Sequence, residues 1–301
     1  MQISPSNTNP DLTASSKRAL YEPTTANTNA PITYFRTCTT DGYQGPAGAI
    51  YAREHGFKSV YVTDNKGTYG IGLAGTFKAE ALKIGLNVLG SGEIGLNVLG
   101  SGELDPNNLA TSAQQFAATI ATKKPGLVYF GGEYGSQGGA ELFADDLRRA
   151  GLKNVTFMGG DGILAQAFID GSSAGGANGA LATTVGGDPT KDPNAQAFLK
   201  AEKAQFPHAS VAAYDTYAYD AATAIIDAFA RAIKNHSIVA GQPMTTACRL
   251  AIARQVQSSD FQGASGPVSF DANGDSRNHT IGVYKVVKRT FVFQAVAPKI
   301  Q

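Results

Sequence analysis

The sequence contains little of what marks several protein classes. It has two cysteines and four histidines in 301 residues, with no CxxC pair and no cluster of cysteine with histidine. We therefore expect no metal site of the zinc type. Cys38 and Cys248 lie far apart in the sequence, and the simplest interpretation is two small buried apolar side chains. Whether the two thiols pair stays open at this point.

Charge imbalance and long apolar runs are also missing. The 25 basic and 24 acidic residues leave a net charge of +1, so nucleic acid is a poor candidate for the main partner. No stretch reaches the roughly 18 apolar residues that a membrane span requires. The opening MQISPSNTNP has neither the basic start nor the apolar core of a signal peptide. We expect that the chain begins within a longer pattern rather than at a natural export start.

The sequence between residues 58 and 162 alternates strand and helix patterns. Strands are expected at 58–64, 126–132 and 155–162, and a short one at NVLG. Helices are expected between these strands, and one helical face is formed by Leu73, Phe77, Ala81 and Ile84. This order predicts right-handed βαβ units and a parallel sheet with helices on both faces. The length of the chain favours two lobes.

The later part of the chain has a different character. The segment 215–235 is expected to form a helix whose apolar face consists of Ala218, Ala222, Ile226, Phe229 and Ile233. The stretches 266–275 and 281–287 are interpreted as strands around an Asn-Gly turn.

The decamer IGLNVLGSGE occurs at 84–93 and again at 94–103. Two short copies are too few for a solenoid, and a tandem duplication explains them. Because a βαβ unit has room for one such strand, we predict that one copy lies in the sheet and the other loops out.

Two motifs and the four histidines have structural interpretations. GIGLAG at 70–75 matches a dinucleotide fingerprint, but six residues, 64–69, separate it from Val62 and Thr63 of the preceding strand pattern, so its glycines are expected to allow close helix–sheet packing. DANGD at 271–275 is interpreted as a turn rather than a calcium loop. The four histidines are interpreted as exposed, and no nucleophile motif is found. We therefore expect neither a cofactor nor an enzymatic activity.

Two acidic residues follow glycine pairs at strand ends, Glu133 in YFGGEYG and Asp161 in FMGGDG. In a parallel sheet both would emerge at the carboxyl edge, where ligands bind. Two carboxylates close together are costly unless a cation is bound, and an ammonium group would serve. The alternative is that both are solvated loop residues.

Seven motifs in order make the chain resemble the branched-chain amino-acid-binding proteins of ABC transporters, the Leu/Ile/Val type of the class I periplasmic binding proteins. The motifs cover essentially the whole chain: ISPSNTNPDLT (3–13), YFRTCTTDGYQGPAGA (34–49), TYGIGLA (68–74), VYFGGEYG (128–135), FMGGDG (157–162), TYAYDAA (216–222) and GPVSFDANGD (266–275).

The resemblance implies an α/β fold of two lobes, each a mostly parallel sheet flanked by helices, with an amino acid bound in the cleft between them. Lobe 1 would consist of 1–40 and 186–265, and lobe 2 of 41–185 and 266–301. The hinge crossings would fall near 38–42, 184–188 and 264–268. The opening βα repeats of the family are not found in this sequence, so the first lobe is expected to be incomplete and ligand affinity to be weakened.

The resemblance also assigns ligand-binding residues. Thr8 would hold the α-groups of the amino acid together with the backbone at Ser6, Asp161 would pair with its ammonium group, and Tyr214 would line the side-chain pocket. Glu133 stands where the family usually has a tyrosine, which argues against a purely aliphatic ligand.

The implied function is the substrate-binding component of an ABC importer for leucine, isoleucine, valine or a related amino acid. A membrane permease would be the partner, the protein would be a monomer, and its location would be periplasmic or extracellular. The alternative is a ligand-sensing domain of a receptor or regulator.

Overall fold

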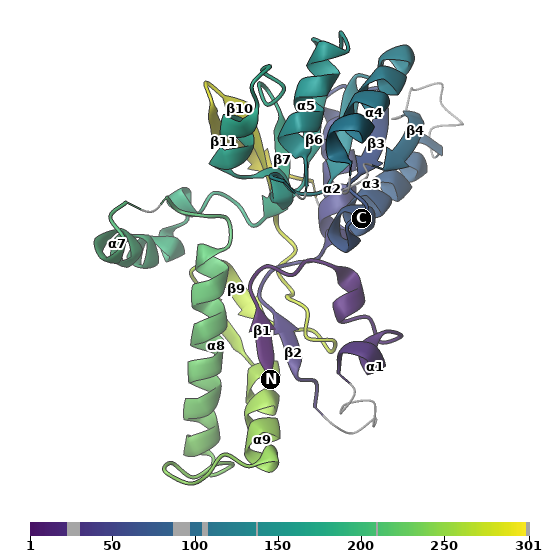
Figure 1. Cartoon of the computed structure of the whole chain (residues 1–301). Helices are drawn as coiled ribbons and strands as arrows, with labels where there is room; N and C mark the ends of the chain where they lie inside the picture. Colours follow the sequence, from purple (N-terminus) through teal and green to yellow (C-terminus); the bar gives the residue numbers. More distant parts are fainter. Residues whose placement is uncertain (23–30, 87–96, 104–107, 137, 209, 299–301) are drawn as a thin grey trace. The chain divides into compact units, whose positions relative to one another are not determined.

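The structure, a computed structural model, describes residues 1–22, 31–86, 97–103, 108–136, 138–208 and 210–298. The chain folds into two compact units (Figure 1). Unit 1 consists of Met1–Thr40 and Asp188–His279, and unit 2 consists of Asp41–Gly187 and Thr280–Gln301.

Unit 2 contains a seven-stranded sheet in the order β11-β10-β7-β6-β5-β3-β4. The strands β3 to β7 are parallel, as the alternation of strand and helix patterns predicted, and β10 and β11 join antiparallel beside β7. The strands are β3 (Ser59–Asp64), β4 (Asn97–Glu103), β5 (Leu127–Gly131), β6 (Thr156–Gly159), β7 (Leu181–Val185), β10 (Ile281–Val287) and β11 (Thr290–Val296).

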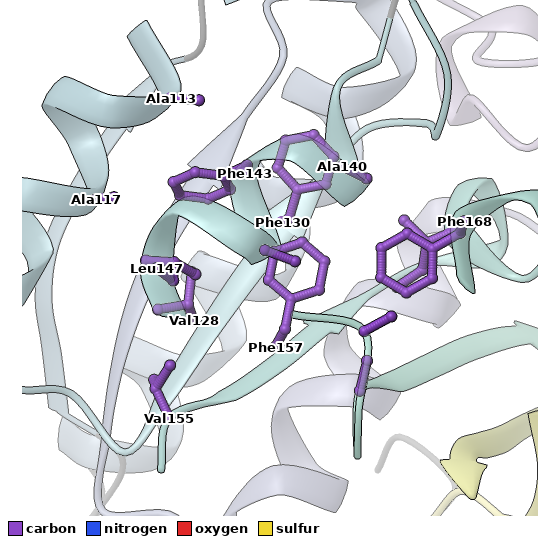
Figure 2. Packing of buried hydrophobic residues seen from close by; sticks show 14 of the residues in the cluster. Ala113, Ala117, Val128, Phe130, Ala140, Phe143, Leu147, Val155, Phe157 and Phe168 are labelled. Atoms are coloured by element: carbon purple, nitrogen blue, oxygen red, sulfur yellow. The ribbon is translucent and has the colours of Figure 1, made fainter. Parts of the chain in front are cut away.

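Helices cover both faces of this sheet, because the strand residues alternate between two buried clusters. One face packs against α4 (Leu109–Lys123), α5 (Ala140–Arg149) and α6 (Gln166–Gly171), and the other against α2 (Asp41–Glu54) and α3 (Thr68–Leu86). Figure 2 shows the first cluster, where the ring centroids of Phe130, Phe143 and Phe157 lie 5.8–6.1 Å apart.

The predicted face of α3 is confirmed, since Leu73, Phe77 and Ala81 are fully buried and Ile84 is 9% exposed. The GIGLAG glycines lie within this helix. A Cβ on Gly70 would lie 2.5 Å from the carbonyl oxygen of Gly131 in β5, so this position requires the close helix–sheet packing that we expected. Gly72 and Gly75 face open space, and the packing interpretation is wrong for them.

The second copy of the duplicated decamer supplies β4, which pairs with β3. One copy therefore occupies the sheet, as predicted. The first copy begins in the last turn of α3, and its residues 87–93 lie outside the described residues.

Unit 1 contains two pairs of strands and its own helices. The parallel pair is β1 (Gln2–Ser4) and β2 (Tyr34–Arg36), and the antiparallel pair is β8 (Asp260–Gly263) and β9 (Gly266–Ser269). The helices are α1 (Arg18–Tyr21), α7 (Gln196–Gln205), α8 (Asp215–Lys234) and α9 (Thr246–Gln257). Short 3-10 turns occur at Pro10–Leu12, Pro189–Lys191 and Pro193–Ala195.

Two sequence expectations differ from the structure at 266–287. Residues 266–279 belong to unit 1 rather than to the second lobe, because β9 pairs with β8 and a Cβ on Gly274 would meet the carbonyl oxygen of Tyr34. The strands at 266–269 and 281–287 do not pair with each other, since β10 lies between β7 and β11. The turn itself is present, closed by a bridge between Phe270 and Ser276.

The expected face of α8 is wrong. Its buried residues are Thr216, Tyr217, Asp220, Ala221, Ala224, Ala228 and Ala232. Ile226 and Ile233 on the opposite face are 68% and 41% exposed, and Phe229 is half-buried. The alanines allow α8 to approach its neighbours closely, so the small residues face the core and the large ones do not.

The cysteines and histidines follow the sequence expectation in most cases. Cys38 is fully buried, Cys248 is half-buried, and neither is in a disulfide bond. All four histidines are exposed. In the described part of the chain, no helix is both long and apolar enough to cross a membrane.

Candidate functional site

Glu133 and Asp161 emerge at the same edge of the unit 2 sheet. The strands β5 and β6 are parallel and pair in register up to Phe130 and Gly159, so the residues that follow leave the sheet at its carboxyl edge. The two loops are joined where the Tyr134 N–H donates to the Gly162 carbonyl oxygen at 3.0 Å. The predicted placement of both acids at this edge is confirmed.

Asp161 is held by two side chains from distant parts of unit 2. Its Oδ1 accepts hydrogen bonds from Gln44 Nε2 at 2.7 Å and from the Tyr69 hydroxyl at 2.9 Å. Gln44 is fully buried, and its Nε2 also donates to the Thr183 carbonyl oxygen at 3.0 Å. The carboxylate itself is half-buried. A fixed, partly accessible carboxylate is suited to accept a hydrogen bond from a cationic ligand.

The glycines beside Asp161 are required by close contacts. A Cβ on Gly160 would lie 2.4 Å from Leu73 Cδ2 and 2.6 Å from the Tyr69 hydroxyl oxygen. A Cβ on Gly162 would lie 2.6 Å from the carbonyl oxygen of Gly132. Any side chain at these positions would displace the groups that orient Asp161.

The buried Tyr129 hydroxyl in β5 lies near the carboxylates of Asp41 and Asp161. Burial raises the pKa of the Tyr129 hydroxyl well above its usual value, and the carboxylates of Asp41 and Asp161 raise it further. Tyr129 therefore stays neutral at physiological pH, and it does not neutralise a ligand cation.

The Glu133 carboxylate is held by a hydrogen bond from the Asn65 side chain. Asn65, which directly follows β3 and is 4% exposed, donates from Nδ2 to Glu133 Oε2 at 2.6 Å. Asn65 is fixed in turn, since its N–H donates to the Gly131 carbonyl oxygen and its Oδ1 accepts from the Gly67 N–H. The Glu133 side chain is half-buried.

In unit 1, Ser6 and Thr8 lie in the turn that follows β1. The buried Ser4 hydroxyl shapes this turn by accepting from the N–H groups of Ser6 and Asn7 at 3.3 and 3.0 Å. Ser6 is exposed, whereas Thr8 is 3% exposed.

Arg36 in β2 holds the loop on both sides of Thr8. Its Nη1 donates to the carbonyl oxygens of Asn7 and Asn9 at 2.7 and 2.8 Å, and its Nε pairs with Asp275 Oδ1 at 2.5 Å. Nη2 donates to the Thr13 hydroxyl. The arginine is fully buried. One charged side chain thus fixes the loop that carries Thr8.

Tyr214 directly precedes α8 and is half-buried. Its ring packs edge-on against Tyr217, with 6.3 Å between centroids. The Tyr217 carbonyl oxygen accepts from the Thr37 hydroxyl at 3.0 Å, and the Thr37 N–H donates to Ser4. Through these contacts the start of α8 lies beside the carboxyl ends of β1 and β2.

The residues that orient the acids and the Thr8 loop were not identified from the sequence. Gln44, Tyr69 and Arg36 lie within motifs that carried the resemblance, but no role followed from the pattern. Asn65 lies directly after a predicted strand, which is the one signal that could have indicated it.

The DANGD segment forms the predicted turn. Asp271 Oδ1 accepts from the N–H groups of Asn273 and Asp275 at 2.8 and 2.9 Å, and Gly274 has a φ of +90°. Among the residues that the structure describes, no group of three or more His, Cys, Asp or Glu side chains could hold a metal ion.

Comparison with known proteins assigns the family. Residues 1–289 match the sequence profile described as "Receptor family ligand binding region". The chain belongs to this family. It is 30% identical over 288 residues to the Leu/Ile/Val-binding protein BraC3 of Rhizobium johnstonii, a match that covers 95% of this chain and 66% of the relative. It is also 30% identical over 224 residues to Leu/Ile/Val-binding protein homolog 3 of Brucella melitensis, covering 72% of this chain and 51% of the relative.

Solved structures of the same kind share the fold. A leucine-binding protein LivK from Thermotoga maritima aligns over 98% of this chain and 72% of its own, with a TM-score of 0.75 and 25% identity. The isoleucine complex of LivJ from Streptococcus pneumoniae aligns over the same shares with a TM-score of 0.72 and 20% identity. The resemblance and the α/β fold class that we predicted from the motifs are confirmed. The chain spans about half to two thirds of the length of the curated relatives.

Proposed function

We propose that the chain is the substrate-binding component of an ABC importer and binds a branched-chain or related amino acid without transforming it. The observation that carries the proposal is the Asp161 carboxylate, fixed by Gln44 and Tyr69 at the carboxyl edge of the unit 2 sheet. The names of the relatives support it, and one from Pseudomonas aeruginosa is named for binding leucine, isoleucine, valine, threonine and alanine.

In this proposal Asp161 accepts a hydrogen bond from the ligand ammonium group. Thr8 and the backbone at Ser6 hold the ligand α-groups, and Tyr214 contacts its side chain. The fixed loop at Thr8 supports its part, because Arg36 Nη1 donates to the carbonyl oxygens on both sides of this residue. The partner would be a membrane permease, and the location would be periplasmic or extracellular.

Calorimetric titration with leucine, isoleucine and valine tests the proposal. Asp161→Asn should weaken binding about 10- to 100-fold, because a charge-assisted hydrogen bond contributes about 1.5–3 kcal/mol. The control is Asp170→Asn, an acid 60% exposed and paired with Arg289, which should leave affinity unchanged. Equal affinity in the Asp161 variant would contradict the role of this residue.

The receptor description of the family favours a second candidate, a ligand-sensing domain. The two functions differ in what the ligand-bound protein activates. Stimulated amino-acid uptake by membrane vesicles that hold the permease would support import, and its absence would favour sensing.

A further inference from the structure

Glu133 is a positioned carboxylate that the proposed ammonium contact does not use. The buried Asn65 amide holds one of its oxygens at 2.6 Å. Asn65 is itself fixed by the backbone of Gly67 and Gly131. Within the described residues, Asn65 is the polar partner of the Glu133 side chain, and no lysine or arginine pairs with it. The carboxylate is therefore oriented but not neutralised.

The arrangement repeats that of Asp161 one strand away. Each acid follows one of two hydrogen-bonded parallel strands, and each is held by a buried amide side chain, Asn65 for Glu133 and Gln44 for Asp161. Neighbouring strands lie about 4.8 Å apart. A ligand whose ammonium group lies at Asp161 therefore places its side chain within reach of the Glu133 loop.

An apolar ligand side chain would be unfavourable beside the Glu133 carboxylate. It would remove water from a half-buried carboxylate without replacing the lost hydrogen bonds, and leaving a polar group unsatisfied is costly, most of all when the group is charged. A side chain that ends in an ammonium group would replace those bonds and offset the repulsion between the two acids.

We propose that Glu133 is a specificity-determining residue that selects amino acids whose side chain ends in a hydrogen-bond donor, above all a cation. This inference rests on the proposed function, because Asp161 must hold the α-ammonium group for the side chain to reach Glu133. It distinguishes this chain from a binder of purely aliphatic amino acids.

Lysine and norleucine form the matched ligand pair for the test, because norleucine has the same carbon chain without the terminal ammonium group. The dissociation constants of both are measured by calorimetry, with competition NMR for weak binding. We expect lysine to bind the 301-residue chain at least about 10-fold more tightly than norleucine. Glu133→Gln should bring this ratio close to one, and Glu133→Tyr should reverse it.

Glu54→Gln is the control variant, since Glu54 is exposed at the end of α2 and the substitution removes the same charge. It should leave the lysine-to-norleucine ratio unchanged. Thermal melts followed by circular dichroism establish that each variant is folded.

The outcomes separate this inference from the proposed function. If leucine and norleucine bind at least as tightly as lysine, or if Glu133→Gln leaves the ratio unchanged, the role of Glu133 is wrong while amino-acid binding stands. If no α-amino acid binds the wild-type chain, both proposals are overturned.

Discussion

In unit 2 the strands β5, β6 and β7 are buried between two layers of helices, whereas unit 1 has two separate pairs of strands. Among the described residues, unit 2 holds apolar clusters of 19 and 18 buried residues, and unit 1 holds one cluster of nine. Both units bury charged side chains, Asp41, Glu80, Asp145 and Asp146 in unit 2 and Glu22, Arg36 and Asp220 in unit 1. Relative to its smaller apolar cluster, unit 1 therefore has the larger share of buried charge.

Apolar packing and buried charged groups respond differently to mutation and to pH. Apolar packing depends on shape and volume and involves no titratable group, so it does not change with pH. A buried charge depends on a complete set of partners, and losing one partner leaves the rest desolvated. Asp220 illustrates this, because its carboxylate accepts from the N–H groups of Ala264 and Ser265 and from the Ser265 hydroxyl. We expect unit 2 to respond to cavities and unit 1 to respond to broken hydrogen bonds.

The largest effect is expected for Phe157→Ala in unit 2. The ring is 1% exposed and contacts Phe130, Phe143 and Phe168, so its removal should cost about 4 kcal/mol through lost transfer energy and a cavity. Urea unfolding followed by circular dichroism measures the loss. Phe206→Ala, at a ring 58% exposed in unit 1, is the control and should cost less than about 0.5 kcal/mol. A similar loss in both variants would contradict the placement of the unit 2 core.

The next effect is expected for Arg36→Met in unit 1. The substitution should cost about 3 kcal/mol, because it leaves Asp275 without its cationic partner and removes the donor to two carbonyl oxygens. Asp275 is 22% exposed, which places the loss at the lower end of the range for buried pairs. Hydrogen exchange should show lost protection in β1, β2 and the loop that carries Thr8, with unit 2 unchanged. Arg254→Met, at an exposed position in α9, is the control and should leave protection unchanged. If Arg36→Met lowers amide protection equally in both units, the idea that Arg36 stabilises unit 1 alone is wrong.

The smallest effect is expected for Asp145→Asn in unit 2. Asp145 is 2% exposed and holds the 172–176 loop. Burial raises the pKa of this carboxyl, but hydrogen bonds from Ser172, Ala174, Gly176 and Ser173 outweigh it, and its pKa is lowered. The substitution should cost about 1–2 kcal/mol at pH 7.

The pH dependence of this loss follows from the sign of the shift. A lowered pKa in the folded state adds stability that is complete above the unfolded-state pKa of about 3.9 and disappears as the pH falls through the folded-state pKa. The difference between wild type and Asp145→Asn should thus be constant from pH 7 to 5 and narrow below about pH 4. Urea unfolding across this range measures it, and a difference that persists to pH 2 would count against the assignment.

The sequence was informative in α3, where the apolar residues Leu73, Phe77, Ala81 and Ile84 recur at intervals of four, four and three and form the buried face. The opposite face is not wholly polar, since Ile71 and Leu82 are 49% and 42% exposed. In α8 the alanines on one face and Ile226 and Ile233 on the other are both apolar, so periodicity alone could not select the buried face. The packing of α8 against α9 and β1 selected it.

The candidate site was predictable in part for a similar reason. Glycine-bounded strand ends located Glu133 and Asp161, because parallel strands share their carboxyl edge. The amides that hold these acids come from residues 68 and 117 positions away in the chain. Such long-range hydrogen bonds leave no local pattern, so only the fold could reveal Asn65 and Gln44.

The position of β10 beside β7 bears on how the protein is made. A ribosome completes β7 and must then produce all of 188–279 before the strand that pairs with β7 exists. Until then the outer side of β7 has exposed backbone groups that could pair with another chain. Nascent chains arrested before residue 280 should therefore depend on chaperones more than full-length chains do.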